Sequence, residues 1–334
     1  MTEKKYLSSL HFLRGFAALA VCLFHFTNGN STYFSDHNLI KTIGSYGHYG
    51  VEIFFVISGV VIPFSMHKGG YELKNFKIFL LKRIIRIEPP YLISIIIVIV
   101  LGYASTLSSY YRGEPFQPNL INLLCHLGYL NAFFQYDWLN PVYWTLAIEF
   151  QYYLLIALIF PLLSSKKTYV WIFTIIIFNL LSLALPSHNF IFSYSLYFTI
   201  GIIMHKFLVG EIPSYLYYSI ISILSIFLFI KFDLPGIISG LIPVILIFSQ
   251  LENKIFKFFG NISYSVYLLH VPVGMRIINL SENFISSDIA RYSVILFATT
   301  CTIAVSYIFY TYVELPCKIS SHKIKYKCQP TYSM

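Results

Sequence analysis

Residues 91–101 read YLISIIIVIVL, a run in which Ser94 is the only side chain that is neither aliphatic nor aromatic. Comparable runs of apolar and small residues occupy 171–185 and 220–230. Across all 334 residues, 57% are hydrophobic, 19% are aromatic and only 11% are charged, whereas a soluble domain carries roughly a quarter charged residues. This composition excludes a water-soluble globular enzyme and predicts an all-α, polytopic bundle of membrane helices.

Ten stretches of the chain approach the roughly 20 residues that a helix needs to cross a bilayer. The expected spans are residues 8–28, 49–66, 90–107, 142–162, 168–185, 190–207, 213–230, 236–251, 260–279 and 290–313. If the N-terminus lies in the cytoplasm, 17 of the 23 Lys and Arg residues fall in inner segments. The positive-inside rule therefore places both termini in the cytoplasm. We expect a membrane-embedded domain over 1–316 and a short basic cytoplasmic tail over 317–334.

The net charge of +9 raises the question of a nucleic-acid partner. The Lys and Arg residues, however, lie in short stretches between apolar runs, as expected for loops that face an anionic cytoplasmic surface. We therefore expect membrane lipids, and no nucleic acid, beside these charges. The expected location is the inner (cytoplasmic) membrane, as a multi-pass protein.

The apolar stretch 120–134 is expected not to cross the membrane. If it did, every later loop would invert, and the lysines at 166, 167, 254 and 257 would face outward, against the positive-inside rule. We expect it to lie in or dip into the outer leaflet, within a long outer segment over 108–140. Two interpretations stay open: a lid or acceptor platform, and an interfacial helix that only seals the bundle.

The cysteines are odd in number and have no paired metal-ligand spacing, so they predict neither a disulfide framework nor a zinc site, and we expect no metal. They are Cys22, Cys125, Cys301, Cys317 and Cys328.

The first expected span carries two ionisable residues, Arg14 and His25. Ionisable side chains are costly inside a membrane, so each is a candidate functional residue. Eleven helical residues complete about three turns, which puts both side chains on one face about 16 Å apart. Small residues between them leave room for an elongated anionic ligand. The alternative is an arginine that reaches the interface, with a hydrogen-bonded core histidine.

Three more charged residues are expected toward the outer side, near the depth of His25. Glu52 lies about one turn into the second span, Glu149 about two turns into the fourth, and Arg276 in the outer part of the ninth. A carboxylate beside an imidazole orients the ring and raises its basicity, which suits general base catalysis. A structural ion pair between Glu149 and Arg276 is the alternative for Glu149.

A basic segment precedes the third span. Lys82, Arg83 and Arg86 occupy an arc of about 100° on a helix, and arginine forks suit phosphates. The alternative is ordinary anchoring to lipid head groups. Because proline lacks a backbone donor, we expect Pro89 and Pro90 to end this helix and to set the entry of the third span.

The start of the ninth span carries a polar face. Ser263, Tyr267 and His270 recur at i, i+4 and i+7 and therefore share one side of a helix. A Ser–His nucleophile pair is disfavoured because seven residues separate the two side chains by about 10 Å along the axis. We expect this face to line a cavity or to pack through hydrogen bonds.

Six motifs in order resemble the signature elements of the acyltransferase 3 family of integral membrane acyltransferases. They are Leu13-Arg14-Gly15 with His25, the acidic-x-Phe-Phe-x-x-Ser-Gly element at 52–59, the arginine-rich stretch 83–91, the Trp-Thr-Leu-x-x-Glu element at 144–149, the block 262–270, and the Glu-x-Pro at 314–316. Together they cover the chain nearly end to end. Glu88 departs from the family pattern because it weakens the positive charge of the arginine-rich stretch.

The resemblance implies transfer of an acyl group, usually acetyl from cytoplasmic acetyl-CoA, to a hydroxyl at the outer face. The implied acceptor is a surface polysaccharide or a lipid-linked sugar, such as O-antigen. Transfer of another acyl group, such as succinyl, is an alternative. A different class of protein, a transporter or flippase for a lipid-linked sugar, also uses charges inside the membrane, but the sequence shows no inverted repeat or matched pair of broken helices.

The resemblance also implies roles for individual residues. Those implied to hold the phosphates of acetyl-CoA are Arg14, Arg83 and Arg86. Those implied in catalysis are His25, as base or transient acyl acceptor, and Glu149 or Glu52, which orients it. Those expected to bind substrate are Trp144, Tyr267, His270 and Arg276.

Overall fold

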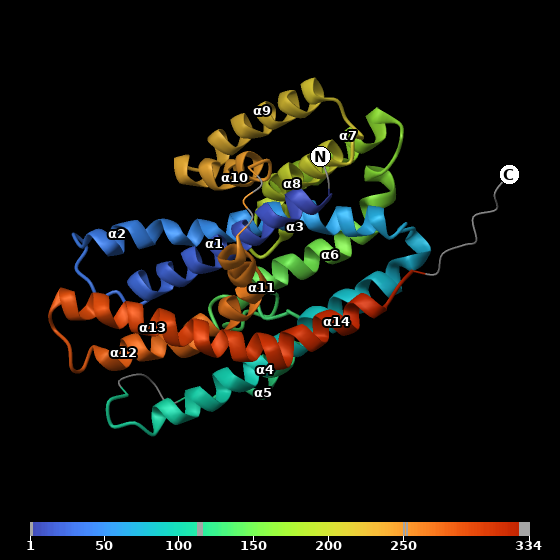
Figure 1. Cartoon of the computed structure of the whole chain (residues 1–334). Helices are drawn as coiled ribbons and strands as arrows, with labels where there is room; N and C mark the ends of the chain where they lie inside the picture. Colours follow the sequence, from blue (N-terminus) through green and yellow to red (C-terminus); the bar gives the residue numbers. More distant parts are fainter. Residues whose placement is uncertain (1–2, 112–115, 250, 252, 327–334) are drawn as a thin grey trace.

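The computed structural model describes residues 3–111, 116–249, 251 and 253–326, and over these residues it consists of helices joined by loops, without a strand (Figure 1). The α-helices are α1 (Glu3–Asn28), α2 (Leu39–Ser45), α3 (Gly50–Lys68), α4 (Phe76–Thr106), α5 (Leu120–Leu127), α6 (Tyr143–Leu163), α7 (Thr168–Ala184), α8 (Ser195–Leu208), α9 (Ser214–Lys231), α10 (Leu234–Leu246), α11 (Lys254–Leu269), α12 (Arg276–Ser281), α13 (Asp288–Phe309) and α14 (Leu315–Lys323). Short 3-10 segments are η1 (Tyr46–Tyr49), η2 (Leu73–Asn75) and η3 (Ile191–Tyr194), and π-helical turns are η4 (His270–Met275) and η5 (Tyr310–Glu314). The all-α expectation is confirmed, and Cys328 lies outside the described residues.

Seven helical stretches among the described residues are long and apolar enough to span a membrane. They are Ser9–Asn28, Leu39–Lys68, Leu73–Thr106, Tyr143–Leu163, Ile191–Leu208, Ser214–Lys231 and Asp288–Lys323. The other three expected spans coincide with α7, α10 and the continuous run from α11 to α12, of which α7 and α10 have only 17 and 13 residues. The chain is therefore a polytopic helical membrane protein.

Glycines allow the helices at the centre of the bundle to approach closely. A Cβ on Gly59 of α3 would lie 2.4 Å from the Phe198 carbonyl oxygen of α8, and one on Gly260 of α11 would lie 2.4 Å from the His11 carbonyl oxygen of α1. Small residues at such crossings let backbones pack directly, which is how helices associate in a membrane. The crossing of α1 and α11 matters most here, because these two helices carry the candidate residues Arg14, His25 and Tyr267.

The expectation that Pro89 and Pro90 end a helix is wrong. Both prolines lie inside α4, which runs without a break for 31 residues. The hydroxyl of Tyr264 on α11 donates to the Ile87 carbonyl over 3.0 Å and so joins α4 to α11 beside the prolines. Packing against neighbouring helices makes proline tolerable in membrane helices. As a result Arg83 and Arg86 stand on the same helix as the third span, and not on a separate helix before it.

Among its described residues, the segment after α4 holds one short helix, α5, whose eight residues are too few to cross a bilayer. This agrees with the expectation that the stretch 120–134 does not span the membrane. His126 of α5 is fully buried, and its Nε2 accepts the Leu139 N–H over 3.1 Å. Asn140 then donates to the Leu268 carbonyl of α11 over 3.1 Å. The segment is thus folded onto the bundle beside α11.

The chain after 316 is largely helical where it is described. The expected boundary at 317 falls inside α14, which packs along α4 (Figure 1). The Ser321 hydroxyl donates to the Lys82 carbonyl over 2.9 Å, and the Lys82 ammonium lies 5.0 Å from the centre of the Tyr326 ring. Residues 327–334 lie outside the described part of the chain.

Candidate active site

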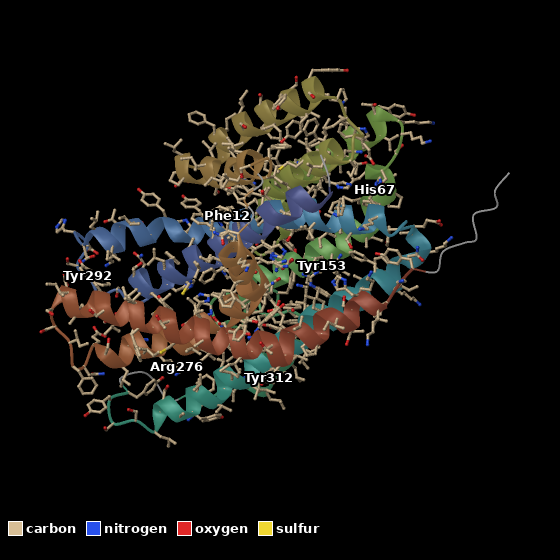
Figure 2. The ribbon with its side chains drawn as sticks, in the orientation of Figure 1. Phe12, His67, Tyr153, Arg276, Tyr292 and Tyr312 are labelled. Carbon is tan, nitrogen blue, oxygen red and sulfur yellow. The ribbon has the colours of Figure 1, made fainter. Side chains whose placement is uncertain are left out.

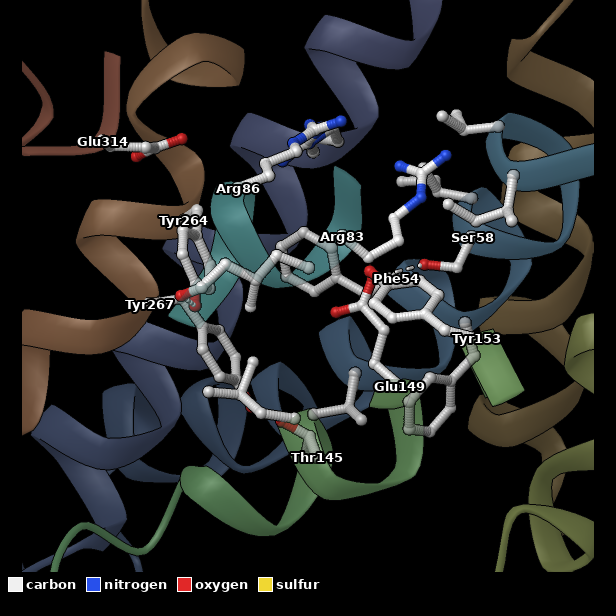
Figure 3. A pocket seen from close by; sticks show the side chains of 18 residues that line it. Phe54, Ser58, Arg83, Arg86, Thr145, Glu149, Tyr153, Tyr264, Tyr267 and Glu314 are labelled. Carbon is white, nitrogen blue, oxygen red and sulfur yellow. Dashed lines mark hydrogen bonds between the residues drawn. The ribbon is translucent and has the colours of Figure 1, made fainter. Parts of the chain in front are cut away.

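A cavity lies between α1, α3, α4, α6 and α11 (Figure 3). We call it the arginine cavity. Its polar wall is made by Arg14, Arg83, Arg86, Glu149, Glu314, Ser58, Thr145, Tyr153, Tyr264 and Tyr267, and apolar side chains such as Phe54 and Val51 complete it. In Figure 3 Arg83, Arg86 and Glu314 lie toward one end of the cavity, and Thr145 lies at the other.

The three arginines expected to bind phosphate meet in this cavity although they come from two helices. The Arg14 Nε on α1 donates to the Ser263 hydroxyl of α11 over 3.3 Å. Arg83 is 6% exposed and lies between two rings, 5.3 Å from the centre of Phe79 and 5.7 Å from that of Tyr153. Its Nε has no hydrogen-bond partner among the described residues. A buried guanidinium with an unused donor is suited to bind an anion.

Glu149 lies with the arginines, and not with His25 as the sequence led us to expect. Its carboxylate accepts hydrogen bonds from the Tyr153 hydroxyl and, over 3.2 Å, from the Ser58 hydroxyl. The depth of Glu149 along α6 was a poor guide because its side chain points into the arginine cavity, whereas His25 lines a different one. A direct role for Glu149 in orienting His25 has no support in this geometry.

A second cavity adjoins the first on the side of His25, and the two share Val51 and Tyr267 in their walls. We call it the histidine cavity. Its wall is made by Val21, Phe24, His25, His48, Val51, Glu52, Pro141, Val142, Trp144 and Tyr267. One carboxylate oxygen of Glu52, Oε2, is buried and has no hydrogen-bond partner among the described residues. Because an unpaired buried acceptor is costly, Glu52 is suited to receive a hydroxyl or another donor from a ligand in this cavity.

Hydrogen bonds select the tautomer of His25. Its Nδ1 lies 3.1 Å from the Val21 carbonyl oxygen and 3.4 Å from Nε2 of His270. The Nδ1 of His270 in turn lies 3.0 Å from the Val266 carbonyl oxygen. A carbonyl oxygen only accepts, so each Nδ1 carries the proton when the ring is neutral. His25 Nε2 is then left with a free lone pair, as a base or a nucleophile requires.

Tyr267 and Val51 belong to the walls of both cavities. The Tyr267 hydroxyl bonds the Thr145 hydroxyl over 2.6 Å, and the Tyr267 ring packs edge-on against Phe54, with 5.7 Å between the ring centres. Tyr267 is 5% exposed. It therefore forms part of the partition between the arginine cavity and the histidine cavity.

The structure brings most, but not all, of the expected substrate-binding residues together. Trp144 lines the histidine cavity, and His270 contacts His25. Arg276 lines neither cavity: its guanidinium donates to the Ser105 hydroxyl of α4. Figure 2 shows Arg276 well separated from Tyr153, the neighbour of Glu149. Among the described residues no ion pair joins Arg276 to Glu149, so the structural alternative for Glu149 is not formed either.

Several polar lining residues were not proposed as site residues from the sequence. Ser58, Tyr153 and Glu314 face the arginine cavity, and His48 faces the histidine cavity. Glu314 is 6% exposed and accepts the Ser265 hydroxyl over 2.6 Å. Ser58 and Glu314 belong to two of the motifs quoted above, and those motifs could have marked them as candidate site residues. His48 lies in the short η1 segment before α3, where nothing in the local pattern marks it.

The sequence pattern that defines the acyltransferase domain family matches residues 7–311. The chain belongs to the acyltransferase 3 family. The matched stretch contains every residue that lines the two cavities except Glu314, which lies after residue 311. No curated protein and no solved structure matches the chain. A membrane acyltransferase needs a place for an acyl donor and one for an acceptor, and this chain has two adjoining cavities.

Proposed function

We propose that this membrane acyltransferase moves an acetyl group from cytoplasmic acetyl-CoA to a hydroxyl of a surface polysaccharide or lipid-linked sugar, such as O-antigen, at the outer face of the inner membrane. The observation that carries the proposal is the pair of cavities that share Tyr267 and Val51. One contains three arginines, and the other contains an imidazole with a free nitrogen and an unpaired carboxylate oxygen.

The arginine cavity suits the donor. Acetyl-CoA is a long polyanion with its charges at one end and its thioester at the other. Arg14, Arg83 and Arg86 would hold phosphates, because guanidinium groups form charge-assisted, often bidentate, bonds with them. The uncharged arm would then extend along the apolar wall toward Tyr267, which brings the thioester to the partition.

The histidine cavity suits the acceptor and the chemistry. His25 Nε2 would take the proton of an acceptor hydroxyl, whose oxygen attacks the thioester carbonyl carbon. The new C–O bond forms as the C–S bond breaks, and the thiolate of CoA receives the proton back from the imidazolium. Glu52 would accept a hydrogen bond from a second sugar hydroxyl. The same lone pair on Nε2 also permits a transient acetyl-imidazole, which the acceptor hydroxyl then attacks.

The experiment that tests this function uses inverted membrane vesicles that contain the protein and a lipid-linked acceptor. Acetyl-CoA labelled in its acetyl group is added outside, where the cytoplasmic face is exposed. We expect label in an ester on the sugar, removable by mild base. An ester formed only from succinyl-CoA would reassign the acyl group. Movement of the sugar across the membrane without esterification would reject transfer in favour of transport.

A further inference from the structure

A second basic surface lies where α14 packs on α4. Leu315, Lys318, Ile319 and His322 recur at i, i+3, i+4 and i+7 on one side of α14 and, with Lys323 and Lys325, line an open hollow of about 800 Å³. We call this hollow the α14 entrance. It begins one residue after Glu314, which lines the arginine cavity. None of its residues belongs to the stretch 7–311 that matches the family.

The packing of α14 places the α14 entrance beside the arginines of α4. Ser321 bonds the Lys82 carbonyl, while Glu314, seven residues earlier, lies near Arg86, four residues later. The two helices therefore run antiparallel, with one face of α14 along the basic face of α4. Lys318, one turn after Glu314, is half-buried on that face, and His322 follows it one turn later in an exposed position.

Few acidic side chains compensate the positive charges around the α14 entrance. Lys318 lies within electrostatic range of Arg86, Arg14 and Glu314. His322 lies within range of Arg86, Lys318, Lys82 and Arg83. Among the described residues, no ion pair joins any of these cations to a carboxylate. Like charges held this close repel each other unless an anion is placed among them.

We propose that Lys318 and His322 bind the 3′-phosphate of the acyl-CoA donor at the α14 entrance. The inference rests on the proposed function and extends it to a site outside the family match. The thioester must lie deepest, near Tyr267, so the phosphorylated ribose at the far end of the donor remains at the mouth of the arginine cavity. Arg83 and Arg86 then bind the diphosphate of the donor, and Lys318 and His322 bind its 3′-phosphate.

The test compares two donors, acetyl-CoA and 3′-dephospho-acetyl-CoA, with the wild type and Lys318→Met in vesicles of neutral lipid. We expect the wild type to have a KM roughly tenfold to a hundredfold lower for acetyl-CoA, as one charge-assisted phosphate contact provides. Lys318→Met should raise the KM for acetyl-CoA to nearly that of the dephospho donor and leave the latter unchanged. Lys318→Arg should keep the preference. The matched control is Lys77→Met, an exposed lysine earlier on α4.

The outcomes separate this inference from the function on which it rests. A wild type that transfers acetyl from neither donor rejects the proposed function, and the inference with it. A wild type that transfers acetyl while Lys318→Met keeps the wild-type preference for the 3′-phosphate rejects the inference alone. An effect of Lys318→Met that is equal for both donors and occurs only in vesicles of anionic lipid would assign the entrance to lipid head groups. If Lys318→Met does not fold, His322→Asn, at an exposed position, replaces it in the same comparison.

Discussion

His25 has one basic nitrogen free because its other ring nitrogen is held by the Val21 carbonyl and His270. We expect His25→Ala to lower acetyl transfer by about a hundredfold or more, since this is the usual contribution of a general base. The protein should still fold, because the ring is only half-buried. The measurement is acetyl transfer per folded molecule in vesicles, with His37→Ala, an exposed histidine of the loop between α1 and α2, as control. Activity within a few-fold of wild type would remove His25 from the chemistry.

The hydrogen-bond partners of Glu149 in the structure predict that this residue affects stability and donor binding. Glu149→Gln keeps one acceptor oxygen for Ser58 and Tyr153 but loses the negative charge that strengthens both hydrogen bonds. It also leaves Arg83 and Arg14 with less compensation in the empty cavity. We expect a lower melting temperature without ligand and a larger stabilisation by CoA than in the wild type, because the anion replaces the lost charge.

Two results would contradict this account of Glu149. If Glu149→Gln and the wild type gain equal thermal stability from CoA, the carboxylate does not share the donor's electrostatic environment. If adding Arg276→Gln to Glu149→Gln restores the lost stability, residues 149 and 276 interact in the protein, although the Arg276 guanidinium donates to the Ser105 hydroxyl in the structure.

Tyr267 is expected to set the size of the acyl group, since it forms part of the partition between the two cavities. Tyr267→Ala should join them and raise kcat/KM for butyryl-CoA relative to acetyl-CoA. Tyr267→Phe keeps the ring and loses only the bond to Thr145, worth about 1 kcal/mol, so its acyl preference should stay that of the wild type. Equal preferences in Tyr267→Ala and the wild type would show that the partition lies elsewhere.

At the residue scale, sequence spacing predicted neighbours along one helix better than partners on different helices. Arg14 and His25 share α1, and each lines a cavity, but the two cavities are different, whereas their spacing of three turns predicted one shared face. The partner of Glu149 was wrong because depth in the membrane does not fix the direction of a side chain around its helix. The contact between His25 and His270 depends on how α1 crosses the π-helical turn η4, which no local pattern encodes.

At the scale of elements, the crossing of α1 and α11 positions both cavities. Gly260→Ala would place a Cβ 2.4 Å from the His11 carbonyl oxygen and 2.6 Å from the His11 Cα, so one helix must move. Such overpacking costs about 1–3 kcal/mol. We expect a lower melting temperature and reduced transfer, because the bond from Arg14 to Ser263 spans this crossing. Gly128→Ala, which meets only the flexible end of Leu130, is the control. Equal stability of the two variants would contradict a tight crossing.

The helices themselves were largely predictable from hydrophobic runs, and their interruptions were not. The ends expected at Pro89 and Pro90 are wrong because α4 continues through both prolines, and packing against neighbouring helices makes proline tolerable inside a membrane helix. The boundary expected at 317 falls within α14, whose Ser321 bonds the Lys82 carbonyl of α4. Contacts between segments this far apart in the sequence are not contained in a local pattern.

At the scale of the whole molecule, composition and the distribution of Lys and Arg contain the information on fold class and membrane location. Apolar runs predict helices in a bilayer whatever their partners are. The arrangement of these helices into two adjoining cavities is not contained in those patterns, because it depends on which polar residues face each other across the bundle. Glu314 illustrates this: it stands among the last described residues, yet it lines a cavity with Arg14 of the first helix.

The two cavities imply that a donor and an acceptor reach the protein from opposite sides of the membrane. In a chain whose five cysteines are replaced by serine, His48→Cys reports on the histidine cavity and Lys325→Cys on the α14 entrance, and both positions are exposed. We expect a membrane-impermeant maleimide to label position 48 in intact spheroplasts and position 325 only in inverted vesicles. The positive-inside rule demands this order, because the lysines of α14 and the basic face of α4 lie together. Labelling of both positions from one side would mean that donor and acceptor meet the protein at the same face, and transfer across the membrane would then be excluded.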